Sequence, residues 1–161
     1  MRGCDHSLRW VDVDLEKRLF DLSYMDSVTK HRGVLPLSRQ AVAILERRKN
    51  SMQDSDMWVF PSETGRGKDG HITLRADKIK TKTGLDITPH SLRRSFTTVG
   101  ERLKLRREDI NLLTNHIDQS VTGKHYSRIG VDDLRAPLQA IASEIERLMT
   151  EGVGVKKISS M

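Results

Sequence analysis

The sequence predicts a mainly helical α+β domain with a small antiparallel sheet near its amino-terminal end. Two short stretches within residues 18–38 alternate as strands do, and amphipathic helix patterns follow them as far as residue 149. A length of 161 residues suits one domain with a sizeable core. We therefore expect a single domain over residues 1–149 and a short tail over residues 150–161.

The strands of the predicted sheet come first. The run LRW leads into VDVDL, which reads as the end of a helix entering a strand. Residues 18–24 alternate apolar and polar side chains, so we expect a strand with one buried face. A polar turn separates it from residues 31–38, HRGVLPLS, where Gly33 and Pro36 favour a position at the sheet edge.

The next segments predict a helix and a short buried run. Ser38 suits the cap of a helix over residues 39–50, whose Val42 and Leu45 face a core. Residues 57–61, MWVFP, read as buried. The glycine-rich loop that follows lacks the spacing of a phosphate-binding P-loop, and residues 73–82 predict a short basic helix.

The stretch TPHSLRRSF, residues 88–96, predicts a helix with one apolar face and one face that carries candidate site residues. Thr88 is a good N-cap and Pro89 a good first residue. One apolar stripe should anchor this helix, through Leu92, Phe96, Val99 and Leu103. His90 and Arg93 share a neighbouring face one turn apart, beside a helix start that we expect to offer unpaired N–H groups to an anion. Arg94 lies farther round the helix, so we leave it out of the site.

Two more helices are predicted toward the carboxyl end. Residues 107–116 form one, held by Ile110 and Leu113 with His116 at its end. Residues 132–149 form a strongly amphipathic one, in whose first turn Pro137 must lie.

Charge and composition narrow the class of partner. Lys and Arg total 28 against 22 acidic residues, a formal charge of +6, which suits a polyanion such as nucleic acid. Aromatic residues are only 4%, so duplex DNA contacted through its phosphates is favoured over a stacked single strand. The lone Cys4 excludes an internal disulfide, and the spacing of the six histidines predicts no structural zinc site. We expect neither a signal peptide nor a membrane span.

Five blocks together resemble the tyrosine recombinases, or phage-type integrases, from about residue 1 to residue 148. They are LRWVDVDL, TKHRGVLPLS, VFPS, ITPHSLRRSFTT and LLTNHIDQSVTGKHY. The last two are the most specific, with a capped H-x-L-R, a histidine 26 residues after His90, and Tyr126 ten residues further on. Asn115 stands where the family usually has glycine.

The resemblance implies a catalytic role for six residues: Arg2, Lys30, His90, Arg93, His116 and Tyr126. Tyr126 would attack a DNA phosphodiester and form a 3′-phosphotyrosyl link. Arg93, His116 and Arg2 (in an R-x-x-D block) would hold the phosphate, and His90 would assist as acid–base or positioning residue. Lys30 would be the general acid, and Lys82 is rejected because it immediately precedes the H-x-L-R helix. Such chemistry needs no metal, ATP or other cofactor.

The resemblance also implies partners and a setting. Double-stranded DNA would be the substrate, other protomers would dock through residues 132–161 unless that helix packs on its own domain, and the protein would be cytoplasmic, bacterial or phage-encoded. The family's amino-terminal DNA-binding domain and front helices have no counterpart ahead of Arg2, so we expect bare apolar surface. Two alternatives stay open: a non-catalytic DNA-binding module, and an inactive remnant of an integrase.

Overall fold

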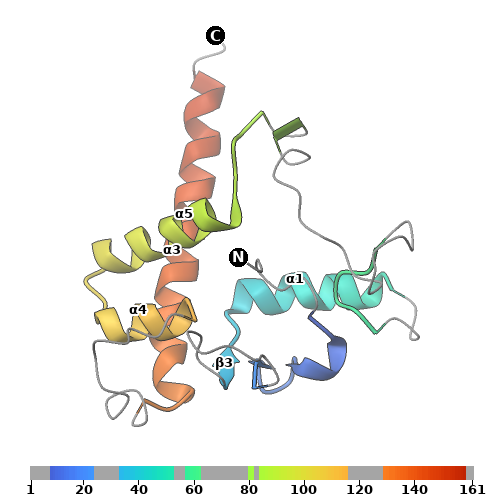
Figure 1. Ribbon diagram of the computed structural model, residues 1–161. Coiled ribbons are helices and arrows are strands. Elements are labelled where there is room, and N and C mark those ends of the chain that lie inside the picture. The colour runs from blue at the N-terminus through green and yellow to red at the C-terminus, as the bar shows by residue number, and fades with distance from the viewer. Residues whose placement is uncertain are drawn as a thin grey trace.

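The computed structural model describes residues 8–23, 33–52, 57–62, 80–81, 84–115 and 129–158, with side chains as far as Glu151. Within these ranges the protein is α+β and mainly helical, as predicted. Figure 1 shows the sheet and α1 gathered on one side of the long helix α5, which α3 crosses.

The sheet is small and antiparallel, with strand order β1-β2-β3. A 3-10 helix, Trp10–Asp12, leads into β1 at Val13–Asp14, followed by β2 at Leu19–Asp21 and β3 at Val34–Pro36. Phe20 pairs with Val13 on one side and with Leu35 on the other. The predicted strands are therefore confirmed, although each is shorter than its sequence pattern.

The segment at residues 57–61 completes this region by pairing with the start of the described chain. Trp10 N donates to Met57 O at 3.0 Å, and Val59 N donates to Leu8 O at 2.8 Å. Val59 is fully buried, as the sequence predicts, whereas Met57 is 59% exposed. Arg48 fixes the segment from α1, since its Nε donates to Val59 O and its guanidinium lies 4.9 Å from the centroid of the Phe60 ring.

Helix α1 spans Arg39–Asn50 and begins where the sequence places it. Ser38 Oγ accepts from Ala41 N at 3.2 Å, which satisfies one of the free N–H groups of the first turn. Val42 and Leu45 are buried, as predicted.

The carboxyl-terminal part is a set of packed helices. They are α3 at Pro89–Arg102, α4 at Arg107–Leu113, a 3-10 turn at Asp132–Leu134, and α5 at Arg135–Ile158. Pro137 lies in the first turn of α5 as expected, and the helix continues into residues 150–158, which the sequence assigned to a tail. Gly100 lies at the crossing, where a Cβ would come within 2.9 Å of Ile110 Cδ1 and 3.2 Å of Ile141 Cδ1.

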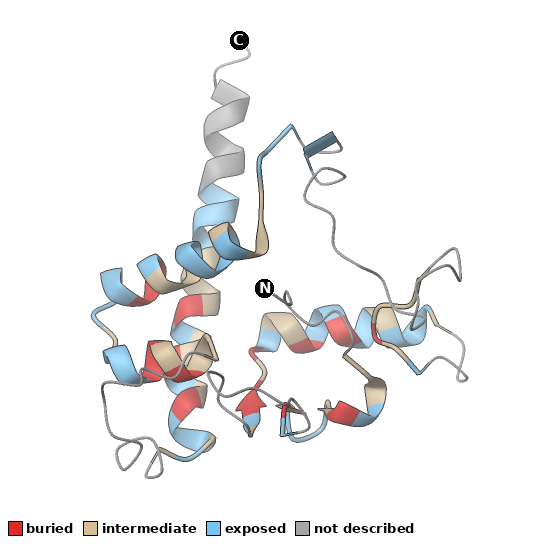
Figure 2. Cartoon of the chain, in the orientation of Figure 1, coloured by how far each residue is buried: buried red, intermediate tan, exposed pale blue. Residues whose placement is uncertain are grey.

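One apolar cluster joins the sheet to the helices. Its buried members are Leu22, Leu35, Leu112 and Leu134, with Phe20, Leu113 and Ile129 packed against them. Figure 2 shows the buried residues on the facing sides of the sheet and helices. The predicted anchor Ile110 is 2% exposed, but Leu112, at 1%, is buried more fully than the predicted Leu113.

The predicted apolar stripe of α3 is only half correct. Val99 is 6% exposed and Phe96 is half-buried, but Leu92 is 53% exposed and Leu103 is 37% exposed. Periodicity identified residues that share a face, yet α4 and α5 cover α3 chiefly near Gly100, so the apolar residues at its two ends remain bare.

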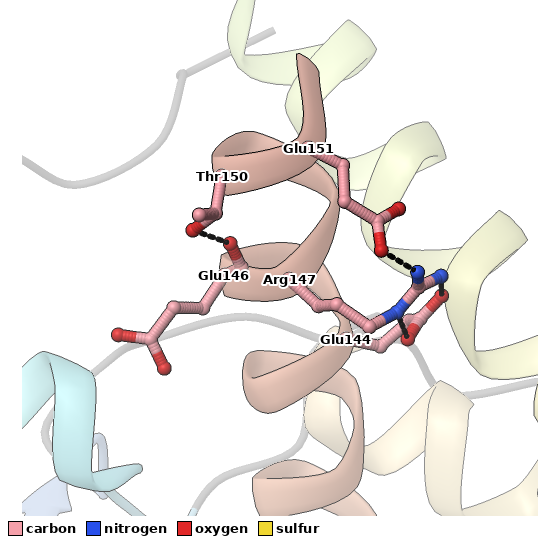
Figure 3. Close-up of polar contacts among 5 residues, drawn as sticks. All are labelled: Glu144, Glu146, Arg147, Thr150 and Glu151. Atoms are coloured by element: carbon pink, nitrogen blue, oxygen red, sulfur yellow. Dashed lines mark hydrogen bonds and ion pairs between the residues drawn. The ribbon is translucent and has the colours of Figure 1, made fainter. Parts of the chain in front are cut away.

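Helix α5 carries an ion-pair network (Figure 3). Arg147 donates to Glu144 at 2.7 Å and to Glu151 at 2.5 Å. The hydrogen bond from Arg147 holds the pKa of Glu144 below its ordinary value, with a smaller contribution from the charge of Arg102. Across the described residues, no helix combines the length and the apolar character needed to cross a membrane.

Candidate nucleic-acid interface and active site

The start of α3 is built by reciprocal capping. Thr88 Oγ1 accepts from Ser91 N at 3.0 Å, and Ser91 Oγ accepts from Thr88 N at 2.8 Å. Pro89 occupies the first helical position. This cap confirms the predicted boundary and fixes His90 and Arg93 in the first two turns.

The cap also reduces what the helix start offers to an anion. Ser91 N is taken by Thr88, Leu92 N donates to Thr88 O at 3.1 Å, and Pro89 has no N–H. The expected row of free N–H groups is therefore wrong: among the first helical residues, the backbone N–H of His90 is left for a ligand. The cationic side chains must supply most of the attraction.

His90 and Arg93 open onto one concave surface of about 660 Å³ between α3 and α4. The residues that line it are His90, Arg93, Arg94, Thr97, Thr98, Glu101, Asn111 and Thr114. Both predicted site residues are exposed, so a large partner can reach them from solvent. Two guanidinium groups against one carboxylate give the concavity a net positive charge, which suits a phosphate.

Arg93 is anchored at the far wall. Its Nη1 donates to the backbone carbonyl of Thr114 at 2.5 Å, just after the last residue of α4. A cation is favoured there, because the carbonyls at a helix end carry partial negative charge. The last turn of α4 has no basic residue of its own, so Arg93 supplies this charge from another helix.

Arg94 was left out of the site by the sequence interpretation, because it lies farther round the helix. It lines the same concavity as His90 and Arg93, and it also lines an adjoining hollow of about 420 Å³. That second hollow includes Arg102 and the hydroxyl side chains of Ser91, Ser95 and Thr98. A long side chain neighbouring Arg93 in sequence reaches the rim even though its Cα lies farther round the helix.

Sequence reasoning missed the α4 wall. Thr114 contributes a backbone carbonyl, a group that every residue carries, so nothing in the residue type could have marked it. The sequence analysis gave no role to Asn111 or Glu101. Only the packing of α3 against α4 brings them to the site.

The structure brings together two of the six predicted catalytic residues, His90 and Arg93. The other four, Arg2, Lys30, His116 and Tyr126, lie outside the described residues. In sequence, His116 follows Thr114 by two positions, directly after the wall on which Arg93 is anchored.

Comparison with known proteins defines the class. The model of the phage integrase family matches residues 6–131, most of the chain. The chain therefore belongs to the phage integrase family.

Two curated relatives agree with this assignment. Prophage integrase IntF of Escherichia coli (strain K12) is 29% identical over 133 residues, which cover 80% of this chain and 28% of that protein. Tyrosine recombinase XerA of Pyrococcus horikoshii is 30% identical over 103 residues, which cover 57% of this chain and 36% of that protein. The chain thus spans about a third of the length of these relatives. No solved structure matches it significantly.

Proposed function

We propose that this chain is the catalytic portion of a site-specific DNA recombinase, which cuts and rejoins strands through a 3′-phosphotyrosyl intermediate. One observation carries the proposal. His90 and Arg93 lie one turn apart on a capped helix and line a positively charged concavity, in a chain that belongs to the phage integrase family. Integration or excision of a mobile element is the biological setting that we propose, inside the cell that holds the DNA.

The proposed chemistry begins at the phenol of Tyr126. Its oxygen attacks the phosphorus, the bond to the 5′-oxygen breaks, and a phosphotyrosyl ester with a free 5′-hydroxyl results. His90 accepts the phenol proton, which a group with an ordinary pKa of about 10 does not readily lose at neutral pH. Lys30 donates a proton to the leaving oxygen. A second 5′-hydroxyl then attacks the ester and reverses these transfers.

The cationic residues stabilise the charge that develops during attack. Arg93, with a planar guanidinium, donates to the non-bridging oxygens, and His116 and Arg2 add further donors. The covalent ester retains the energy of the phosphodiester bond, so rejoining requires no ATP. The exposed, open concavity suits a duplex rather than a small molecule, which would be buried in a closed pocket.

Covalent trapping tests the proposal. The full chain is mixed with a labelled pool of nicked duplexes that carry randomised sequence around the nick, so that the freed strand diffuses away and the adduct accumulates. Tyr126→Phe should abolish the adduct on a denaturing gel while DNA binding is kept. Tyr24→Phe is the matched control, since the chain has two tyrosines, and it should react like the wild type.

The results of covalent trapping distinguish a recombinase from a non-catalytic DNA-binding module and from an inactive remnant. An adduct of equal yield from Tyr126→Phe would exclude the proposed nucleophile. Specific binding with no adduct from the wild type would favour a non-catalytic DNA-binding module. Loss of both binding and adduct in a folded chain would favour an inactive remnant.

Protomer contacts are a separate part of the proposal. Leu148 and Met149 are 37% and 67% exposed on the outer part of α5, beyond the turns that pack on α3. We propose that this part of α5 docks on another protomer when DNA is bound. Light scattering of the DNA complex should give a smaller mass for Leu148→Asp with Met149→Asp than for wild type, and an equal mass would exclude docking through these residues.

A further inference from the structure

The end of α4 is a left-handed turn. Thr114 caps the helix, and Asn115 follows with a φ of 54°, in the region that favours glycine. Asn115 N donates to Leu112 O at 2.9 Å, and Thr114 N donates to Ile110 O at 2.9 Å. Asparagine is among the residues that tolerate this conformation best after glycine.

Thr114 is held by its own helix through its side chain as well. Its hydroxyl shares one hydrogen between two carbonyls of α4, Ile110 O at 2.8 Å and Asn111 O at 3.1 Å. The carbonyl of Thr114, which has no partner within its own helix, accepts from Arg93 Nη1 at 2.5 Å. The left-handed φ of Asn115 turns the chain off the axis of α4, so no further turn of the same helix takes the Thr114 carbonyl, which stays open to Arg93.

The side chain of Asn115 carries a buried oxygen. Its Oδ1 is buried, and the part of the chain that the structure describes supplies no donor for it. A buried acceptor without a partner opposes folding. What Asn115 contributes here is its left-handed backbone, which ends α4 and leaves the Thr114 carbonyl free to accept from Arg93.

We propose that Asn115 is a positioning residue, which acts through the Thr114 carbonyl to hold the guanidinium of Arg93 in one orientation. One Nη1–H is occupied by the carbonyl, and the remaining N–H groups are then directed at the concavity, where the phosphate binds. The orientation itself is a property of the unliganded chain. Its importance for strand cleavage rests on the function proposed above.

The first test needs neither DNA nor activity. Nitrogen NMR of the full chain reports rotation of each arginine side chain, and Arg93→Lys assigns the Arg93 signals. A guanidinium held by a carbonyl should give separate, slowly exchanging Nη signals in the wild type and in Asn115→Gly, which keeps the left-handed turn. In Asn115→Ala these signals should merge. The signals of Arg94, the other arginine of the concavity, should not change.

The second test follows cleavage. Asn115→Ala should slow single-turnover formation of the covalent adduct by roughly 10- to 100-fold, because a small misplacement of a catalytic group has effects of that size. Asn115→Gly should restore the rate to within about 3-fold of wild type. In an Arg93→Lys background, Asn115→Ala should cause little further loss, since it acts through the guanidinium that is already absent.

The outcomes are distinct. Merged Arg93 signals in the wild type would overturn the proposal even if Asn115→Ala failed to fold. Full, additive loss from Asn115→Ala in the Arg93→Lys background would also overturn it, because the effect would then be general destabilisation. Separate Arg93 signals with no adduct from any variant would leave the positioning intact and count against the proposed recombinase chemistry instead.

Discussion

Gly100 is the residue on which the packing of three helices depends. An added Cβ would lie 2.9 Å from Ile110 Cδ1, 3.0 Å from Ile110 Cγ1 and 3.2 Å from Ile141 Cδ1. Alanine normally stabilises a helix interior by about 1 kcal/mol relative to glycine, but overpacking costs about 1–3 kcal/mol. Because the closest of these contacts is below 3.0 Å, the cost should exceed the gain, and we expect Gly100→Ala to lower the free energy of unfolding by up to about 2 kcal/mol in a urea titration.

Two variants control this prediction. At Gly130 a Cβ would meet nothing closer than Asp133 Oδ2 at 3.5 Å, so Gly130→Ala should be nearly neutral. Adding Ile110→Val to Gly100→Ala removes Cδ1 and should recover part of the loss. If Gly100→Ala were as stable as the wild type, the close approach of α3 to α4 would be wrong.

For single residues, the sequence was most informative where a side chain bonds the backbone of a residue a few positions away. Ser38 and Thr88 were predicted as caps and are caps, because capping joins neighbours in the chain. Leu92 was misjudged, because exposure at one position of a helix face depends on which partners cover it. The place of Arg94 on the concavity was not foreseen for the same reason. The anchoring of Arg93 on a backbone carbonyl could not be read from residue types at all.

Among the elements, α3 depends on its first turn. Thr88→Ala removes the acceptor for Ser91 N and should lower stability by about 1 kcal/mol. Because His90 and Arg93 lie in the turns that would fray, DNA affinity should fall as well. Urea unfolding and DNA titration measure the two effects, and Thr88→Ser, which keeps the oxygen, should preserve both. A stable Thr88→Ala chain would show that packing alone fixes the helix start.

Helix α5 should respond to acid through Glu144. Arg147 hydrogen-bonds this carboxylate and lowers its pKa from the ordinary value of 4.5. A carboxylate with a lowered folded-state pKa stabilises the fold above its unfolded pKa, and this contribution is lost as the pH falls through the folded value. The helix should therefore melt at a lower temperature near pH 3 than near pH 6, by circular dichroism.

Substitution isolates this contribution. Glu144→Gln should show a smaller change in melting temperature between the two pH values, and Arg147→Gln should reduce it similarly, because each removes one side of the pair. Both groups are partly exposed, so added salt should also weaken the effect. An undiminished pH response in both variants would assign the acid sensitivity to other carboxylates.

Several elements could be predicted in kind but not in extent. The two predicted strands and the helix over residues 39–50 are present, since their patterns are local. The pairing of Trp10 with Met57 was beyond sequence reasoning, because it joins segments almost fifty residues apart. Strand lengths were overestimated for the same reason: alternation continues past the point where a neighbouring strand is available.

For the molecule as a whole, the positive charge concentrated on the α3 surface should govern affinity for DNA. The formal charge is +6, and Arg94 lies at the boundary of two concave surfaces, beside the site of the proposed phosphate. Arg94→Gln should weaken binding to any duplex and reduce the slope of log affinity against log salt by about 1. Fluorescence anisotropy over a range of salt concentrations measures this slope.

A matched arginine makes the salt experiment specific. Arg47 is exposed on α1, where its Nε donates to the Ala43 carbonyl of its own helix, away from both hollows. Arg47→Gln changes the net charge by the same amount and should leave the slope nearly unchanged. Equal changes from the two variants would mean that the protein is attracted by overall charge rather than by the α3 surface.

The hydrogen bonds that connect α5 to α1 and to the β1–β2 turn have a consequence for how the chain is made. Arg39 N and Gln40 Nε2, at the start of α1, donate to Gln139 Oε1 and to Glu146. Arg135 donates to the carbonyl of Lys17, so residues about one hundred positions apart are linked. The hairpin strands and α1 rest on near neighbours and can form early. Their docking onto α5 must wait until that helix has left the ribosome, and closing so large a loop is slow. Until then the apolar face formed by Leu22 and Leu35 is exposed to water, because Leu112 and Leu134, which cover it, come later in the chain.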